Sequence, residues 1–210
     1  MKNRKTSVFD GILGENIVLS SLMLISPVII CGDTVQNAFA LIYAFNAITL
    51  ISMIIGSFVP KKLPYTLKII IYAVISSLVY IPVRIAAEGF YPESVERIGI
   101  YYPLLAVNSI IVLQSEAKFF RMKRGKMIVS LIFYIIGFDA VMLITAFLRE
   151  IFSYGTVYSK MVGIDTLISG LGQPFGGFIF LGLLCGLYRA LRSVFREKNE
   201  TRSDADVSGK

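Results

Sequence analysis

Six apolar runs of membrane-spanning length limit what this chain can fold into more than any other feature. The runs cover residues 14–32, 35–59, 67–87, 98–115, 126–149 and 175–194. A helix rises about 1.5 Å per residue, so about 20 residues cross the roughly 30 Å hydrocarbon core of a bilayer. The pattern predicts an all-α integral membrane protein with six transmembrane helices.

Composition favours one membrane domain with no soluble domain attached. The chain is 55% hydrophobic and 17% charged, whereas soluble domains are about 25% charged. We expect a cytoplasmic N-terminal segment at 1–13 and a six-helix membrane domain at 14–194. The polar, charge-rich segment at 195–210 is predicted to be a disordered tail.

The basic residues predict the orientation. Six spans place both termini on one side, and if that side is the cytoplasm, the termini and the loops at 60–68 and 116–126 hold 17 of the 21 Lys and Arg residues. Cytoplasmic loops are enriched in Lys and Arg, so the bias predicts an N-in/C-in topology in the inner (cytoplasmic) membrane. The same bias accounts for the net charge of +7, so no nucleic-acid partner is expected.

The two halves of the chain begin in the same way. The first run contains Ser26-Pro27, and the fourth contains Pro103 followed by Asn108-Ser109. Because each half has three spans, the second half must be inverted relative to the first, which predicts two inverted three-helix repeats. Matched, interrupted segments in two such halves point to a site at the middle of the membrane. We therefore expect Ser26, Pro27, Asn108 and Ser109 to form a midplane site.

Cysteine and histidine usage excludes several kinds of site. The chain has two cysteines, Cys31 and Cys185, and no histidine. Two cysteines are too few for a disulfide framework, and the lack of histidine excludes His-ligated haem, zinc or copper within this chain. No phosphate-binding loop, zinc spacing or nucleophile triad is present. The sequence predicts no catalytic residue and no metal ligand.

Other candidate residues lie outside the broken segments. Asp139 falls near the middle of the fifth run, where an acid costs about 2.5–3.5 kcal/mol on insertion scales. It is either a cation or proton site or a structural acid that is protonated, hydrogen-bonded or paired. Glu116 and Glu150 lie at the ends of apolar runs. Each is either a group in an ion pathway or an interfacial residue that anchors the span or forms an ion pair. Gly182 and Gly186 form a G-x-x-x-G pattern that permits close helix packing.

Several short segments follow one another in a characteristic order along the chain. They are Phe9-Asp10-Gly11, Leu24-Ile25-Ser26-Pro27, Thr34-Val35-Gln36-Asn37-Ala38, Tyr102-Pro103 through Ile111, Ser115-Glu116-Ala117, Leu148-Arg149-Glu150-Ile151 with Gly155-Thr156, and Pro174 through Leu184. These segments resemble the RnfE/NqrD-type membrane subunits of the Rnf/Nqr electron-transport complexes. The likeness extends from about residue 9 to 190. No single segment is enough to identify the family, but the segments taken together are specific for it.

The resemblance implies a six-helix subunit of a complex that couples electron transfer to Na⁺ or H⁺ movement. It also implies a homologous partner subunit in the opposite orientation, with an iron–sulfur centre held by cysteines of both subunits. This chain departs from that pattern, because serine stands at both cysteine positions, Ser26 and Ser109. Iron–sulfur clusters are held by thiolates, and a serine hydroxyl is a poor substitute. We predict no cofactor on this chain and expect flavin and iron–sulfur centres on partner subunits.

Two functional hypotheses follow from these residues. The first is a non-catalytic or accessory membrane subunit of an Rnf/Nqr-like ion-translocating oxidoreductase complex. The alternative is a transporter or structural membrane subunit that uses the inverted-repeat fold without a redox role. In that alternative, Ser26, Asn108 and Ser109 would supply a polar midplane site for a cation or solute.

Overall fold

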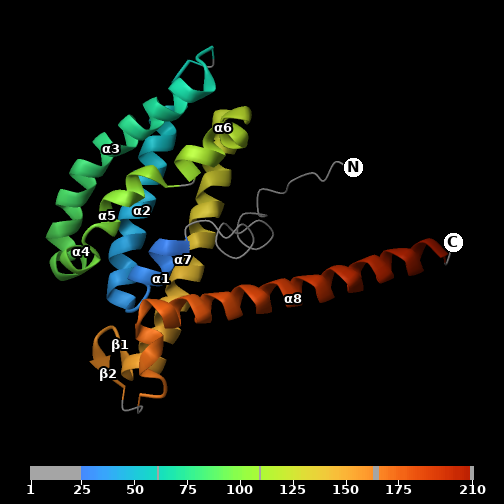
Figure 1. Cartoon of the computed structure of the whole chain (residues 1–210). Coiled ribbons are helices and arrows are strands. Elements are labelled where there is room, and N and C mark those ends of the chain that lie inside the picture. The colour runs from blue at the N-terminus through green and yellow to red at the C-terminus, as the bar shows by residue number, and fades with distance from the viewer. Residues whose placement is uncertain (1–24, 61, 109, 163–165, 209–210) are drawn as a thin grey trace.

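Among the described residues, three long helices pack together and a fourth projects from them (Figure 1). The computed structural model describes residues 25–60, 62–108, 110–162 and 166–208. Helices α2 (Val35–Gly56), α3 (Tyr65–Phe90) and α7 (Arg124–Tyr154) pack along one another, with α2 between the other two. Helix α8 (Pro174–Ser208) starts beside the end of α7 and extends away from the group.

Short elements connect the long helices. Helix α1 (Ile25–Cys31) precedes α2, and α4 (Pro92–Ile98) follows α3. The chain then returns through α5 (Tyr101–Leu104), the 3₁₀ turn η2 (Leu105–Val107), the π-helical segment η3 (Ile110–Gln114), α6 (Ser115–Ala117) and η4 (Phe119–Arg121). Between α7 and α8 lie the strands β1 (Thr156–Val157) and β2 (Lys160–Met161) and the 3₁₀ turn η5 (Ser169–Gly172).

The two strands form a small antiparallel hairpin after α7. Thr156 pairs with Met161, and Val157 pairs with Lys160. The two connecting residues, Tyr158 and Ser159, have φ values of 54° and 59°. Positive φ at both central residues is what a two-residue hairpin loop of type I′ requires. We call the end of the helix group that carries this hairpin the hairpin end, and the opposite end, where η4 joins α7, the basic-loop end.

The predicted membrane spans are confirmed in part. Among the described residues, α2, α3 and α7 are long and apolar enough to cross a membrane, and they match the predicted spans 35–59, 67–87 and 126–149. A fourth candidate is the pair Pro92–Ile98 and Tyr101–Arg121, which is bent by 82°. The apolar part of α8, Pro174–Ala190, is shorter than the other spans. Of the predicted first span, 14–32, residues 14–24 lie outside the described residues.

Helix α2 lies at the centre of the apolar core. Its residues Ala38, Leu41, Ala44 and Phe45 are fully buried. Small side chains let neighbouring helices approach closely, which is how helices associate in lipid. The ring of Phe45 packs on Phe138 of α7 with centroids 4.2 Å apart. Apolar packing of α2 against α7 is therefore close.

The ends of the long helices follow from local sequence. The Thr34 side chain accepts a hydrogen bond from the Asn37 backbone N–H at 3.4 Å and caps α2. Helix α7 ends at Gly155, whose φ of 64° suits a residue without a side chain. The backbone of α8 is helical through to Ser208, where the sequence predicted a disordered tail. The boundaries of the three predicted segments stay predictions.

A substitution at Gly176 of α8 tests how closely η5 packs against this helix. A Cβ at Gly176 would lie 2.1 Å from the Gly170 carbonyl oxygen, whereas a Cβ at Gly186 would meet nothing within 4 Å. We expect Gly176→Ala to destabilise the chain by about 1–3 kcal/mol through overpacking, and Gly186→Ala to be neutral. The measurement is thermal unfolding of the detergent-solubilised chain by circular dichroism. Equal midpoints for the two variants would contradict this packing.

Candidate functional site

A buried carboxylate organises the hairpin end. Glu150 is fully buried near the end of α7. One carboxylate oxygen accepts a hydrogen bond from the Val35 backbone N–H at 2.6 Å. The other accepts from the Thr156 hydroxyl at 3.1 Å and from the Ser159 backbone N–H at 2.8 Å. Glu150 therefore satisfies a free N–H at the start of α2 and holds the hairpin against α7.

The neighbouring residue, Arg149, binds backbone carbonyl groups. Its side chain is 1% exposed. It donates to the carbonyl oxygens of Ile29 at 2.6 Å and Gly32 at 2.9 Å, at the end of α1. It also donates to the carbonyl oxygens of Leu171, Gly172 and Gln173, where η5 meets α8. Because a guanidinium offers five donors in one plane, this one side chain bonds the free carbonyl groups at two places, the end of α1 and the junction of η5 with α8.

A second polar contact joins α2 to α7 near the middle of both helices. The Asn46 side-chain amide donates to Asp139 Oδ2 at 2.9 Å. The other two oxygens of this pair, Asn46 Oδ1 and Asp139 Oδ1, are buried and have no hydrogen-bond partner among the described residues. Asp139 is thus a hydrogen-bonded acid within a membrane span, but its bonding is incomplete.

The two contacts between α2 and α7 are in register. Eleven residues separate Val35 from Asn46, and eleven separate Asp139 from Glu150. Eleven residues make about three helical turns and rise about 16.5 Å. Both contacts therefore lie on the same face of each antiparallel helix.

Asn108 completes the backbone hydrogen bonds at the break in the fourth run. Its Oδ1 accepts from the backbone N–H groups of Ile110 at 3.1 Å and Ile111 at 3.2 Å. Its amide donates to the Leu105 carbonyl oxygen and to Thr49 Oγ1, each at 3.0 Å. Irregular backbone at membrane depth is tolerated where other protein groups form hydrogen bonds with its free N–H and C=O groups. Asn108 therefore holds both sides of the break and ties them to α2.

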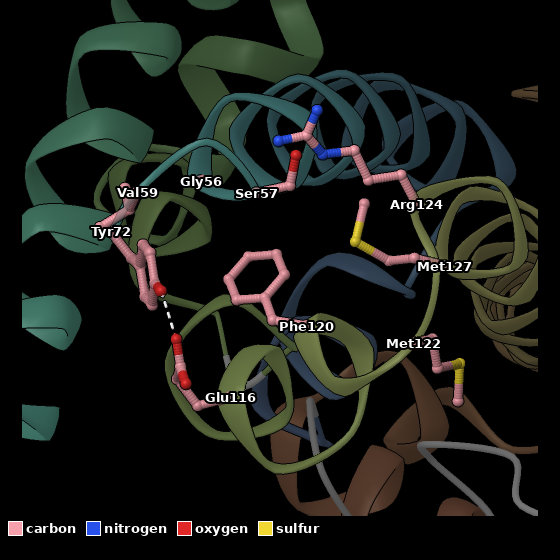
Figure 2. A pocket seen from close by; sticks show the side chains of 9 residues that line it. All are labelled: Gly56, Ser57, Val59, Tyr72, Glu116, Phe120, Met122, Arg124 and Met127. Carbon is pink, nitrogen blue, oxygen red and sulfur yellow. Dashed lines mark hydrogen bonds between the residues drawn. The ribbon is translucent and has the colours of Figure 1, made fainter. Parts of the chain in front are cut away.

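Glu116 lies at the basic-loop end, in the wall of a cavity of about 140 Å³ that Figure 2 shows. The Tyr72 hydroxyl donates to one of its oxygens, drawn as a dashed line. Lys68 Nζ lies 3.2 Å from the other. The cavity is also lined by Gly56, at the end of α2, and by Arg124, at the start of α7. Glu116 is thus half of an ion pair that faces a cavity.

The donor atoms at the broken segments do not fit an iron–sulfur cluster. Ser26 is exposed near the start of α1, and Pro27 beside it is half-buried. Ser109 lies outside the described residues, so the predicted proximity of Ser26 to Ser109 stays a prediction. Both cysteines are buried and free, Cys31 at the end of α1 and Cys185 within α8. Within the described part of the chain, no group of three or more His, Cys, Asp or Glu side chains could hold a metal ion.

The G-x-x-x-G pattern faces outward. Gly182 and Gly186 are exposed, and a Cβ at either would meet nothing within 4 Å. Their predicted part in close helix packing is not realised among the described residues. Packing of these glycines against another subunit stays a prediction.

Sequence reasoning missed several side chains that bond to the candidate site residues. Asn46 is the partner of Asp139, and Lys68 and Tyr72 are the partners of Glu116. A signal for Asn46 was available, because it is an amide in the middle of its apolar run and lies at the depth of Asp139 in an antiparallel neighbour. Nothing in the sequence marked Arg149 as a ligand of five carbonyl oxygens.

The role of Asn108 can be tested by removing its amide. Asn108→Leu leaves two N–H groups, one carbonyl and one hydroxyl without their partner, at about 1–3 kcal/mol for each buried group left unsatisfied. Thr49→Val removes only one of the four bonds. We expect the loss of thermal stability, measured by circular dichroism, to be clearly larger for Asn108→Leu. A similar loss in both variants would show that the amide does not hold the break together.

Comparisons with known proteins show the family to which this chain belongs. Two relatives, from Salmonella paratyphi B and Salmonella heidelberg, are named as subunits of an ion-translocating oxidoreductase complex, and each is 26% identical to this chain. Each alignment covers 100% of this chain and 98% of the relative. The family model described as "Rnf-Nqr subunit, membrane protein" matches residues 5–185. This multi-pass membrane protein therefore belongs to the Rnf-Nqr family of membrane subunits.

Proposed function

We propose that this chain is a membrane subunit of an ion-translocating oxidoreductase complex. The observation that carries the proposal is the family match over residues 5–185. It is supported by relatives that align over nearly their whole length and are named as subunits of such a complex. The buried polar groups agree with this role, because ionisable side chains within spans are costly and mark ion or proton pathways.

In this proposal the chain forms six helices in two inverted three-helix repeats, with both termini in the cytoplasm. The distribution of charge supports the orientation. Lys62 and Lys123 both lie in loops at the basic-loop end. Arg97 and Lys160 lie at the hairpin end, with fewer basic residues around them. Positively charged loops favour the cytoplasmic side.

The chain acts as an accessory rather than a catalytic subunit. Serine at position 26 supports the view that it does not hold an iron–sulfur cluster in the manner of its family. Flavin and iron–sulfur centres then belong to partner subunits, including a homologous subunit in the opposite orientation. This chain would shape the membrane core around Asp139 and Glu116 in the inner membrane.

Purification of the assembled complex tests this function. We expect the tagged chain to copurify with a homologous membrane subunit and with subunits that carry flavin and iron–sulfur centres, identified by mass spectrometry and absorption. The chain purified alone should contain no stoichiometric iron and give no cluster signal in electron paramagnetic resonance. Copurification with a transport ATPase or a solute-binding protein would favour the transporter alternative instead.

Topology can be tested by labelling single cysteines. In a chain with Cys31 and Cys185 replaced by alanine, we expect Lys62→Cys and Lys123→Cys to react with an impermeant thiol reagent only from the cytoplasm. Lys160→Cys, on the exposed strand β2, is the matched control and should react only from outside. Labelling of residues 62 and 123 from outside would overturn the N-in/C-in orientation.

A further inference from the structure

The Asn46–Asp139 pair has one hydrogen bond where its atoms allow two. The Asn46 amide donates to Asp139 Oδ2 at 2.9 Å, while Asn46 Oδ1 and Asp139 Oδ1 have no partner among the described residues. Both of these oxygens are buried acceptors. A buried polar atom without a partner costs about 1–3 kcal/mol and calls for an explanation.

We propose that Asn46 and Asp139 form a proton-binding site within the membrane, reached along α2 from the Glu116 cavity and closed toward the hairpin end. The proposal rests on the proposed function, since it names where an ion-moving subunit would bind a proton. The proton binds to Asp139 Oδ1, forms an O–H bond and neutralises the carboxylate. The new O–H then donates to Asn46 Oδ1, so one proton gives both unpaired oxygens a partner. Release breaks the same O–H bond, and no electrons move.

A proton fits this pair better than a metal cation does. Hard cations take several oxygen ligands, six or more for Ca²⁺ and six for Mg²⁺. The described residues place only two unpaired oxygens at the pair, and they include no group of three or more ionisable metal ligands. One hydrogen bond between two oxygens needs no further ligand.

Few other charges act on Asp139. Helix α2 has no charged residue, and Asp139 is the only charged residue of α7 between Lys126 and Arg149. The elements packed on α7 bring the ionisable side chains of Tyr43 on α2, Cys31 on α1 and Arg121 on η4, and α7 itself carries Tyr134. Within the described part of the chain, the hydrogen-bond partner of Asp139 is Asn46 alone. Its charge state therefore depends mainly on the pair itself.

Polar residues continue from the pair toward the basic-loop end. Thr49 and Ser52 follow Asn46 at intervals of three residues along α2 and are buried. Gly56, one turn further, lines the cavity that Glu116 faces (Figure 2). The stretch from Asn46 to Gly56 spans about 15 Å of helix. The hydroxyl groups of Ser52 and of Ser115, beside Glu116, have no partner among the described residues. Such hydroxyls can donate to and accept from water, as a proton path requires.

In the opposite direction the buried side chains of α2 are apolar as far as Ala38, beyond which Asn37 is buried and polar. The side chains of Ala38, Leu41 and Ala44 are fully buried, and Phe45 packs on Phe138. Tyr43, on the same stretch, packs on Phe90 of α3. On α7 the hydroxyl of Thr145, which also has no partner among the described residues, is the one buried polar group between Asp139 and Arg149. A single hydroxyl makes no continuous path, so the proposed access to Asp139 is from the basic-loop end.

Carbodiimide labelling tests the proton site without measuring activity. Dicyclohexylcarbodiimide reacts with protonated carboxyl groups in apolar surroundings. In membranes that hold the assembled complex, we expect mass spectrometry to find the adduct on Asp139, with labelling lost as the pH is raised into the alkaline range. Asp139→Asn should abolish the adduct, and Glu150, whose oxygens already accept three hydrogen bonds, should stay unmodified. An unlabelled Asp139, or labelling that does not depend on pH, would overturn the proton site.

Silver ions test the one-sided path, because Ag⁺ is close to water in size and binds thiols. With Cys31 and Cys185 replaced by alanine, we expect Ag⁺ added at the cytoplasmic face to bind Ser52→Cys and Ser115→Cys. Binding is read as protection from a maleimide added after denaturation. Ala44→Cys, on the apolar side of the pair, is the matched control and should stay unprotected. No protection at residues 52 and 115, or equal protection at residue 44, would overturn the path.

These outcomes are separate from the test of the proposed function. Labelling and silver binding report on this chain whatever its partners, whereas copurification reports on the complex. A complex with the expected cofactors but an unlabelled Asp139 would overturn the proton site alone. A labelled Asp139 in a chain that copurifies with transport subunits would overturn the proposed function and leave the proton site standing.

Discussion

Two hydrogen bonds in register hold α2 against α7, and the rest of the structure is arranged around this pair of helices. Glu150 accepts from the start of α2, and Asp139 accepts from its middle. In lipid there is little hydrophobic drive for one helix to associate with another, so packing and polar contacts must fix their relative position. Small residues on α2 permit the close approach, and the two polar contacts determine its register. Helix α3 and the broken segment then pack on the remaining faces of α2.

Irregular backbone within the helix group is stabilised by single side chains that satisfy several groups at once. Asn108 bonds both sides of the break between η2 and η3, and Arg149 bonds the carbonyl groups at the ends of α1 and η5. A chain in a membrane has no water to serve these groups, so each break needs a dedicated partner. This requirement explains why an arginine is 1% exposed in a protein with few charges.

Sequence reasoning found three of the six predicted spans among the described residues, because a long apolar run is a strong signal, and α2, α3 and α7 lie where those runs predicted. It found Asp139 as a costly acid in a span, and Asn108 as a polar residue at a break. It missed Asn46 and Lys68, because their roles depend on which helices become neighbours. Glu150 was predicted at a span end, but its bonds reach Val35, 115 residues away in the chain. Such long-range contacts depend on the packed structure and have no local signature.

The equal spacing of the two α2–α7 contacts couples the lengths of these helices. One residue inserted between Val35 and Asn46 would turn the amide by about 100° and move it about 1.5 Å along the axis. The amide would then face away from Asp139 while Glu150 still held the start of α2. A single matching residue between Asp139 and Glu150 would restore the height of the carboxylate but would turn it in the same sense as the amide, so the two groups would still point apart. About seven residues, close to two whole turns, added to both stretches would keep both contacts. Insertions and deletions in these two stretches should therefore be tolerated only as paired whole turns, so that the two helices vary in length together or not at all.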